Sequence, residues 1–142
     1  MAEKDSIVLT FDVDSDDFTR AGEASSRLKR TLKQMGLPPD IIRRISIVMY
    51  EGEINMVIHA HGGKITVTVD DDAVTMVLAD IGPGIPDVEK AMQAGWSTAS
   101  AAVRQQGFGA GMGLPNMKKN ADTLEIDTVV GVGTTVTAVV RL

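Results

Sequence analysis

Apolar and polar residues follow two spacings along this chain, and these spacings divide it into strands and helices. Segments in which apolar and polar residues alternate are typical of half-buried strands, whereas apolar residues at three- and four-residue intervals predict amphipathic helices. The expected elements are a strand over 7–13, helices over 16–35 and 39–60, strands over 65–69 and 74–78, helices over 87–94 and 114–120, and strands over 123–129 and 134–141.

Capping and helix-breaking residues set the expected ends of the two long helices. The Asp-rich stretch 12–17 supplies side chains that can cap the first helix, and Gly36 and Pro38 end it. Gly62 and Gly63 end the second helix. One side of this second helix carries residues at helical spacing, namely Ile41, Ile45, Val48, Met49, Gly52 and Met56.

The order of the elements predicts the fold class. A strand, two helices, a hairpin, a loop, a further helix and a last hairpin indicate the α/β (α+β) class, in one domain over 1–142. Asp70-Asp71-Asp72 forms the turn of the first hairpin, and Gly131 and Gly133 separate the strands of the second. We therefore expect a two-layer sandwich, in which helices cover one face of a mixed, mostly antiparallel sheet.

Composition excludes several classes of function. The formal net charge is -5 and basic residues occur in pairs such as Arg43-Arg44, so sequence-independent binding of nucleic acid is not expected. The absence of cysteine excludes disulfides and thiolate metal sites. The N-terminal residues do not form a signal peptide, and no apolar run approaches the roughly 18 residues of a membrane span. We expect a cytoplasmic protein without membrane contact.

A polar stripe runs along the second predicted helix. Glu51 and Asn55 are four residues apart and His59 lies four further on, so the three side chains share one face. Such a stripe could line a pocket, but taken alone a solvated face of the helix is the simpler interpretation. For His59, we favour a simpler role, in which it complements the helix dipole.

A carboxylate followed by small residues ends the strand expected near 74–78. In Asp80-Ile81-Gly82-Pro83-Gly84, the missing Cβ atoms at the glycines allow a base or amine to approach the backbone. An ionised carboxylate only accepts hydrogen bonds, which suits an exocyclic amino group such as that of adenine. A tight turn after a strand is the alternative interpretation.

Glycines at alternate positions occupy 107–113 and lead into a predicted helix. Unpaired N–H groups and the positive end of a helix dipole can hold phosphates, although a flexible linker could have the same composition. The segment fits neither a P-loop nor a Rossmann motif.

The order and spacing of these motifs, followed by Gly131-x-Gly133-Thr134, resemble the Bergerat-type ATP-binding fold of DNA gyrase, Hsp90, sensor histidine kinases and MutL. Three further segments make the chain similar to the bacterial anti-sigma-factor serine/threonine kinases, and within them to the stressosome switch kinases. These segments are Gly82-Pro83-Gly84-Ile85-Pro86-Asp87, Gly95-Trp96-Ser97-Thr98 and Gly111-Met112-Gly113-Leu114-Pro115.

The resemblance implies a role for each motif residue. Asn55 would coordinate Mg²⁺ bound to ATP, and Glu51 would act as general base toward the hydroxyl group of a protein substrate. Asp80 would read adenine with the help of Thr134. Gly82 and Gly84 would let the nucleotide lie against the backbone. The phosphates would be held by Gly109, Gly111 and Gly113.

The resemblance also implies a flexible ATP lid over about 95–113. Residues 99–106 make this segment longer than is usual for the stressosome switch kinases. Arg104 is the sole cation between Gly95 and Gly113 and could reach the γ-phosphate, although a solvated charge is the simpler interpretation. Trp96 could pack in the lid or contact a partner.

The implied function is a protein serine/threonine kinase that uses ATP and Mg²⁺ to phosphorylate a STAS-type antagonist protein in a partner-switching pathway. The alternative is an ATP-binding anti-sigma factor that mainly sequesters a sigma factor. A scaffold that binds no nucleotide is a third possibility, which the intact motifs disfavour. The strand over 7–13 could also pair across a homodimer.

Overall fold

The computed structural model of this chain describes residues 6–14, 21–85, 88, 92 and 113–142. Apart from the start of the first helix, the elements predicted in these regions are present, with ends that differ by at most two residues. They are β1 (Ile7–Val13), α1 (Glu23–Gln34), α2 (Pro39–His59), β2 (Gly63–Val69), β3 (Ala73–Asp80), α5 (Gly113–Asn120), β4 (Thr123–Val129) and β5 (Gly133–Arg141).

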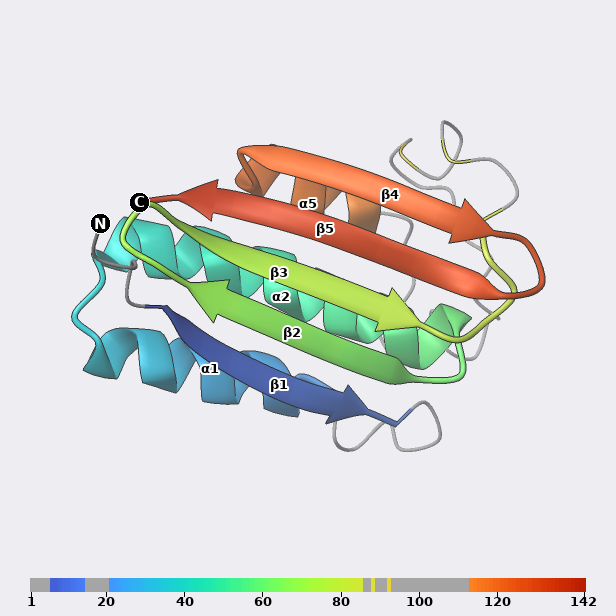
Figure 1. Cartoon of the computed structure of the whole chain (residues 1–142), viewed down its shortest axis with the longest axis horizontal. Coiled ribbons are helices and arrows are strands. Elements are labelled where there is room, and N and C mark those ends of the chain that lie inside the picture. The colour runs from blue at the N-terminus through green and yellow to red at the C-terminus, as the bar shows by residue number, and fades with distance from the viewer. Residues whose placement is uncertain (1–5, 15–20, 86–87, 89–91, 93–112) are drawn as a thin grey trace.

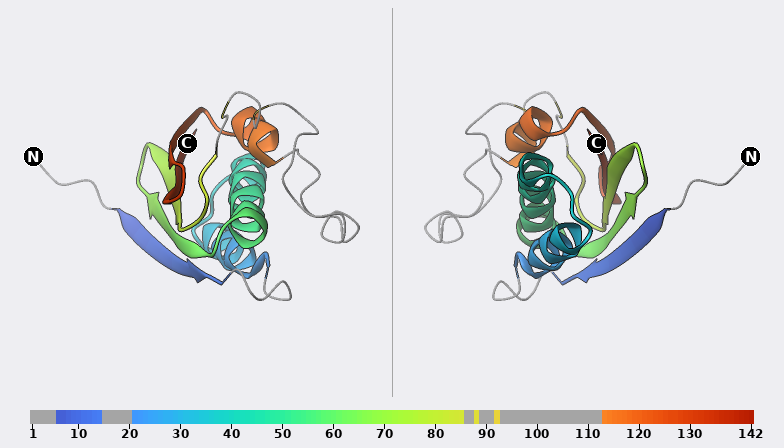
Figure 2. Two further views of the ribbon diagram at one scale, coloured as in Figure 1. Left: turned by 90° about the vertical axis from the view of Figure 1, so that its right-hand side faces the viewer. Right: turned by 90° about the vertical axis from the view of Figure 1, so that its left-hand side faces the viewer.

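The strands form one sheet in the order β1-β2-β3-β5-β4, and α1, α2 and α5 all lie on one of its faces (Figure 1 and Figure 2). The predicted α+β class and two-layer arrangement are therefore confirmed. The expectation of a mixed sheet was wrong for the described strands, because each of their pairings is antiparallel. β4 runs in the same direction as β3, but β5 lies between them and pairs with both.

The inner strands bury every second residue against the helices, as the alternating sequence predicted. Val67 of β2 lies opposite Met76 of β3, which in turn lies opposite Ala138 of β5, so one buried row crosses the sheet. The outward-facing positions carry polar residues such as Thr66 and Thr75, which suit a solvated face.

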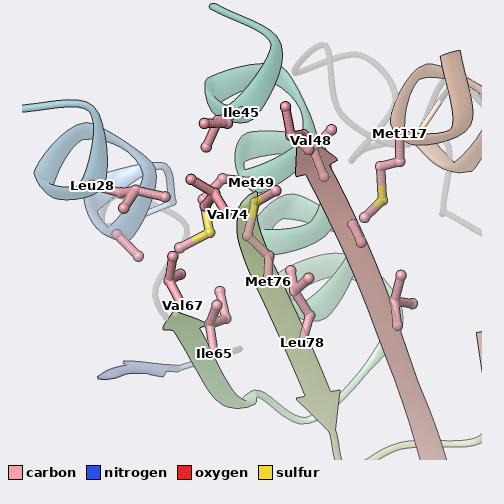
Figure 3. Packing of buried hydrophobic residues seen from close by; sticks show 14 of the residues in the cluster. Leu28, Ile45, Val48, Met49, Ile65, Val67, Val74, Met76, Leu78 and Met117 are labelled. Carbon is pink, nitrogen blue, oxygen red and sulfur yellow. The ribbon is translucent and has the colours of Figure 1, made fainter. Parts of the chain in front are cut away.

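Helix α2 supplies the other half of the core. Its residues Ile45, Val48 and Met49 are completely buried against the sheet, where Leu28 of α1 and Met117 of α5 pack at the two sides (Figure 3). The apolar side predicted for this helix is the buried side, and of its six predicted members only Ile41 is partly exposed. Because α2 is covered by the sheet and by two helices, its position fixes theirs.

The first helix begins later than the sequence predicted. We expected it from residue 16 with caps from the Asp-rich stretch 12–17, but α1 starts at Glu23 and follows Gly22, which has a φ of 92°. Residues 15–20 lie outside the described residues. Gly22 has no side chain with which to cap this end of the helix. The N–H groups at the start of α1 are satisfied by Glu53, a residue of α2.

Glu53 is 3% exposed and inserts its carboxylate into the N-terminus of α1. Oε2 accepts hydrogen bonds from the backbone N–H groups of Gly22 and Ala24, both at 3.1 Å. Oε1 accepts from the backbone N–H of Ser25 at 3.0 Å and from its hydroxyl at 2.7 Å. A buried negative charge is tolerated here because four donors and the positive end of the helix dipole surround it.

Some predicted features lie outside the described residues. The helix expected over 87–94 is described only at Val88 and Met92, which share a backbone hydrogen bond of 3.0 Å, and nearly all of the expected lid over 95–113 is not described. Within the parts of the chain that the structure covers, no helix is both long and apolar enough to cross a membrane.

Replacing Glu53 with alanine should destabilise the protein by roughly 3 kcal/mol, because it leaves buried N–H groups at the start of α1 without an acceptor. The measurement is urea denaturation at neutral pH. Glu125→Ala is the matched control, since Glu125 is exposed on β4 and its loss should change the free energy of unfolding by less than about 0.5 kcal/mol. A loss below about 1 kcal/mol for Glu53→Ala would show that α1 is held by apolar packing alone.

Candidate functional site

The predicted site residues come from distant parts of the sequence, and the described ones lie around the C-terminal half of α2. Glu51 and Asn55 are half-buried on this helix. The backbone N–H of His61, just beyond α2, donates to the carbonyl of Ile81 at 2.7 Å. The end of α2 therefore meets the segment that follows Asp80.

Asn55 lies directly against the start of α5. A Cβ atom added to Gly113 would come within 2.9 Å of both the Nδ2 and the Oδ1 atom of Asn55. Any larger residue here would displace the Asn55 amide. The last glycine of the predicted phosphate-binding segment and the predicted magnesium ligand are thus neighbours.

Asp80 is the last residue of β3 and is half-buried. Its Oδ1 atom accepts a hydrogen bond of 2.9 Å from the backbone N–H of Thr134, near the start of β5. Burial raises the pKa of the Asp80 carboxyl, and the hydrogen bond from Thr134 opposes part of that rise. Two residues that the sequence assigned to adenine, Asp80 and Thr134, are therefore in direct contact.

Thr128 on β4 is a site residue that the sequence analysis missed. Its hydroxyl oxygen lies 2.9 Å from that of buried Thr134 and accepts a hydrogen bond of 2.8 Å from the backbone N–H of Ile85. It therefore links the segment after β3 to β5. Threonine is so common in strands that no signal in the sequence singled it out.

The two glycines after Asp80 pack against the β4–β5 hairpin. Gly82 donates its N–H to the carbonyl of Val132 at 3.2 Å, and a Cβ atom on it would meet Ala60 at 2.9 Å. Gly84 has a φ of 77°, and a Cβ atom there would lie 2.7 Å from the carbonyl oxygen of Val129. These contacts keep the segment close to both the hairpin and the end of α2.

Glu51 has a partner on α5 that the sequence did not suggest. The side-chain Nδ2 atom of Asn116 donates to its Oε1 atom at 3.3 Å, and both residues are partly buried. An asparagine within a short helix looks like an ordinary solvated residue in the sequence.

Other predicted residues remain untested by the geometry. Gly109, Gly111, Arg104 and Trp96 lie outside the described residues, as does the side chain of His59. Among the residues that are described, no three His, Cys, Asp or Glu side chains gather as a metal-binding group.

The residues present fit a magnesium nucleotide. The Asn55 amide offers one oxygen to a hard cation, and Mg²⁺ usually keeps water and phosphate oxygens as its other ligands. Asp80 offers carboxylate oxygens to an amino group. Glu51 stands one helical turn from Asn55, within reach of the same bound molecule.

Comparisons with known proteins agree with this arrangement. Residues 15–140 match the histidine kinase-like ATPase domain. The serine/threonine-protein kinase RsbT of Bacillus subtilis is 31% identical over 82% of this chain and 85% of its own length. An anti-sigma F factor of Caldanaerobacter subterraneus is 36% identical over 67% of this chain and 66% of its own, and one of Bacillus licheniformis is 31% identical over 74% and 73%. The chain therefore belongs to the histidine kinase-like ATPase domain family.

Proposed function

We propose that this protein is an ATP-dependent protein serine/threonine kinase that phosphorylates a STAS-type antagonist protein and so switches the partners with which that protein associates. The observation that carries the proposal is that α5 lies against Glu51 and Asn55 on one side of α2, while the C-terminal end of α2 contacts the segment that follows Asp80. Similarity to a protein named a serine/threonine kinase supports the type of reaction.

The nucleotide would be held at two ends. Asp80 accepts a hydrogen bond from the adenine amino group and Thr134 helps to hold the base, while Gly82 and Gly84 allow the nucleotide to lie against the backbone. At the other end, Gly109, Gly111 and Gly113 hold the phosphates, and the Asn55 amide oxygen binds Mg²⁺. Bound Mg²⁺ neutralises charge on the phosphate oxygens.

Glu51 would act as the general base. It accepts the proton of a serine or threonine hydroxyl as that oxygen forms a bond to the γ-phosphorus atom. The bond from the γ-phosphorus to the bridging oxygen breaks, and ADP leaves with the electron pair. Its position one helical turn from Asn55, the proposed magnesium ligand, supports this role.

A second function has its own support, because several relatives are named anti-sigma F factors. In that case the chain binds a sigma factor and uses ATP mainly as a conformational ligand. Incubation with γ-labelled ATP, Mg²⁺ and STAS proteins from the same genome separates the two functions. Label transferred to a STAS protein supports the kinase, whereas intact ATP binding without transfer supports the second function.

We also propose a homodimer and a cytoplasmic location. β1 is an edge strand of the sheet, and its residues Ile7 and Val8 are 46% and 58% exposed. An edge strand can pair through its backbone with the same strand of a second copy. Sedimentation velocity at increasing protein concentration tests the dimer. The cytoplasmic location is proposed because the cytoplasm supplies the ATP that the reaction consumes.

Glu51→Gln should lower phosphoryl transfer to the STAS protein by roughly 10²- to 10⁴-fold, because the amide cannot accept the proton of the hydroxyl group. ATP binding, measured by calorimetry with Mg²⁺ present, should be retained. Glu125→Gln, at an exposed position on β4, is the control and should transfer phosphate at the normal rate. Unchanged transfer by Glu51→Gln would remove Glu51 as the base.

Asp80→Asn should weaken ATP binding by at least about tenfold, because its amide group would turn a donor toward the adenine amino group. Calorimetric titration with ATP and Mg²⁺ measures this loss. Asp71→Asn, in the exposed β2–β3 turn, is the control and should bind ATP normally. ATP affinity equal to that of the wild type would show that Asp80 does not read the base.

Asp80→Asn should be at least as stable to urea as the wild type at neutral pH. The pKa of Asp80 is raised in the folded protein, so the native state holds this proton more tightly than the unfolded state does. Stability from this group is therefore present at low pH and is lost as the pH rises through the raised pKa. In urea denaturation, the wild type should gain stability relative to Asp80→Asn on acidification. A relative loss on acidification would contradict the raised pKa.

A further inference from the structure

Helices α2 and α5 run antiparallel and meet through a series of contacts. Gly113 packs on Asn55, and a Cβ atom on Gly52 would meet the Met117 side chain at 3.2 Å. Further along, the Nε atom of Arg44 donates to the carbonyl of Asn120 at 3.0 Å. As residue numbers rise on α5, those of the facing residues on α2 fall, which defines the direction of the pair.

Asn116 faces Glu51 in the middle of this series, at 3.3 Å between Nδ2 and Oε1. An ionised carboxylate has only acceptor sites, so the amide nitrogen of Asn116 must be the atom that faces it. The bond holds one carboxylate oxygen and leaves the other to accept a proton. Hydrogen bonds to catalytic groups are often long before substrate binds and shorten in the complex.

We propose that Asn116 is a positioning residue for phosphoryl transfer, which holds the Glu51 carboxylate in the orientation that accepts the proton of the substrate hydroxyl. This inference rests on the proposed function, since it gives Glu51 the role of general base. It extends that function to a residue on α5, the helix that begins at Gly113 against Asn55.

The neighbours of Asn116 make it suitable for this role because they fix α5 at both ends. Met117 is completely buried and Leu114 is nearly so. Beyond the helix, Arg44 forms an ion pair of 3.2 Å with Asp122, and an Asp122 oxygen accepts a hydrogen bond from the backbone N–H of Arg141. A side chain on a helix held in this way has little freedom to move, which is what a positioning group requires.

The first test compares Asn116→Ala and Asn116→Asp in transfer of label from ATP to the STAS protein that accepts phosphate from the wild type. Loss of the hydrogen bond should lower kcat roughly tenfold and leave the KM for ATP unchanged. Asn116→Asp keeps the shape of the side chain but places a second negative charge against Glu51, so it should lose at least as much. Asn116→Gln should recover part of the rate. A normal kcat in Asn116→Asp would overturn the proposal.

A matched control is available on the same helix. The side chain of Asn120 lies one turn further along and donates to the Asn116 carbonyl at 2.9 Å, so Asn120→Ala removes an asparagine and leaves the bond from Asn116 to Glu51 in place. It should transfer phosphate at the normal rate. If Asn120→Ala lowers kcat as much as Asn116→Ala does, general damage to α5 explains both effects and the proposal fails.

Combining variants separates failure of this proposal from failure of the proposed function. If Asn116 acts through Glu51, Asn116→Ala should cause no further loss in a Glu51→Gln background, whereas an undiminished loss overturns the proposal. A strong effect of Glu51→Gln with no effect of Asn116→Ala leaves the kinase assignment standing and removes Asn116. A wild type that binds ATP but phosphorylates no STAS protein, or a fully active Glu51→Gln, removes both.

A second readout needs no substrate. In ¹⁵N-labelled protein, the side-chain amide signals of Asn116 should shift when Glu51 is replaced by alanine and should stay in place in Glu125→Ala. Unmoved Asn116 signals in Glu51→Ala would show that the contact is absent in solution, and that result would overturn the proposal.

Discussion

The close approach of α2 to the sheet determines where the other parts of this fold can lie. At Gly52 the helix is so near β3 that a Cβ atom would collide with the buried Leu78 side chain, so any larger residue would have to displace that side chain or move α2 away from the sheet. At this depth one side of α2 is buried in the core and its flanks contact α1 and α5. The candidate site lies along one of these flanks.

Three polar residues of α2 serve two different neighbours, and helix geometry explains how. Successive residues are about 100° apart around a helix, so Glu53 points about 200° away from Glu51, whereas Asn55 returns to within about 40° of it. Glu53 therefore meets the N-terminus of α1, and Glu51 and Asn55 face α5. Residues 51–55 of α2 therefore contact α1 on one side and α5, beside the candidate site, on the other.

The sequence predicted the elements better than it predicted their contacts. Alternation located the strands and three-to-four spacing located α2, because burial on one face imposes those periods. Neither period says which strands pair, so the position of β5 between β3 and β4 could not be foreseen. Glu53 was missed because its partners are mostly backbone N–H groups 28 to 31 residues away, which every sequence has.

The residues of the candidate site also divide into those that local sequence spacing indicates and those that only tertiary contacts reveal. Glu51, Asn55, Asp80 and Gly113 were proposed from the sequence because each belongs to a motif with a fixed local spacing. Thr128 and Asn116 were not, since their contacts with Ile85 and Glu51 join residues distant in sequence, and a threonine in a strand or an asparagine in a helix has simpler explanations. Residues that support a site through tertiary contacts leave little trace in a single sequence.

The surroundings of Asp80 bear on which nucleotide the proposed site prefers. Burial disfavours its charged form, yet the N–H of Thr134 binds one of its oxygens and helps to keep the carboxylate in place. A half-buried carboxylate attracts a donor and repels an acceptor more strongly than an exposed one would. Adenine presents an amino group where guanine presents a carbonyl oxygen. The same burial that disfavours the charged form of Asp80 therefore favours ATP over GTP in the proposed site.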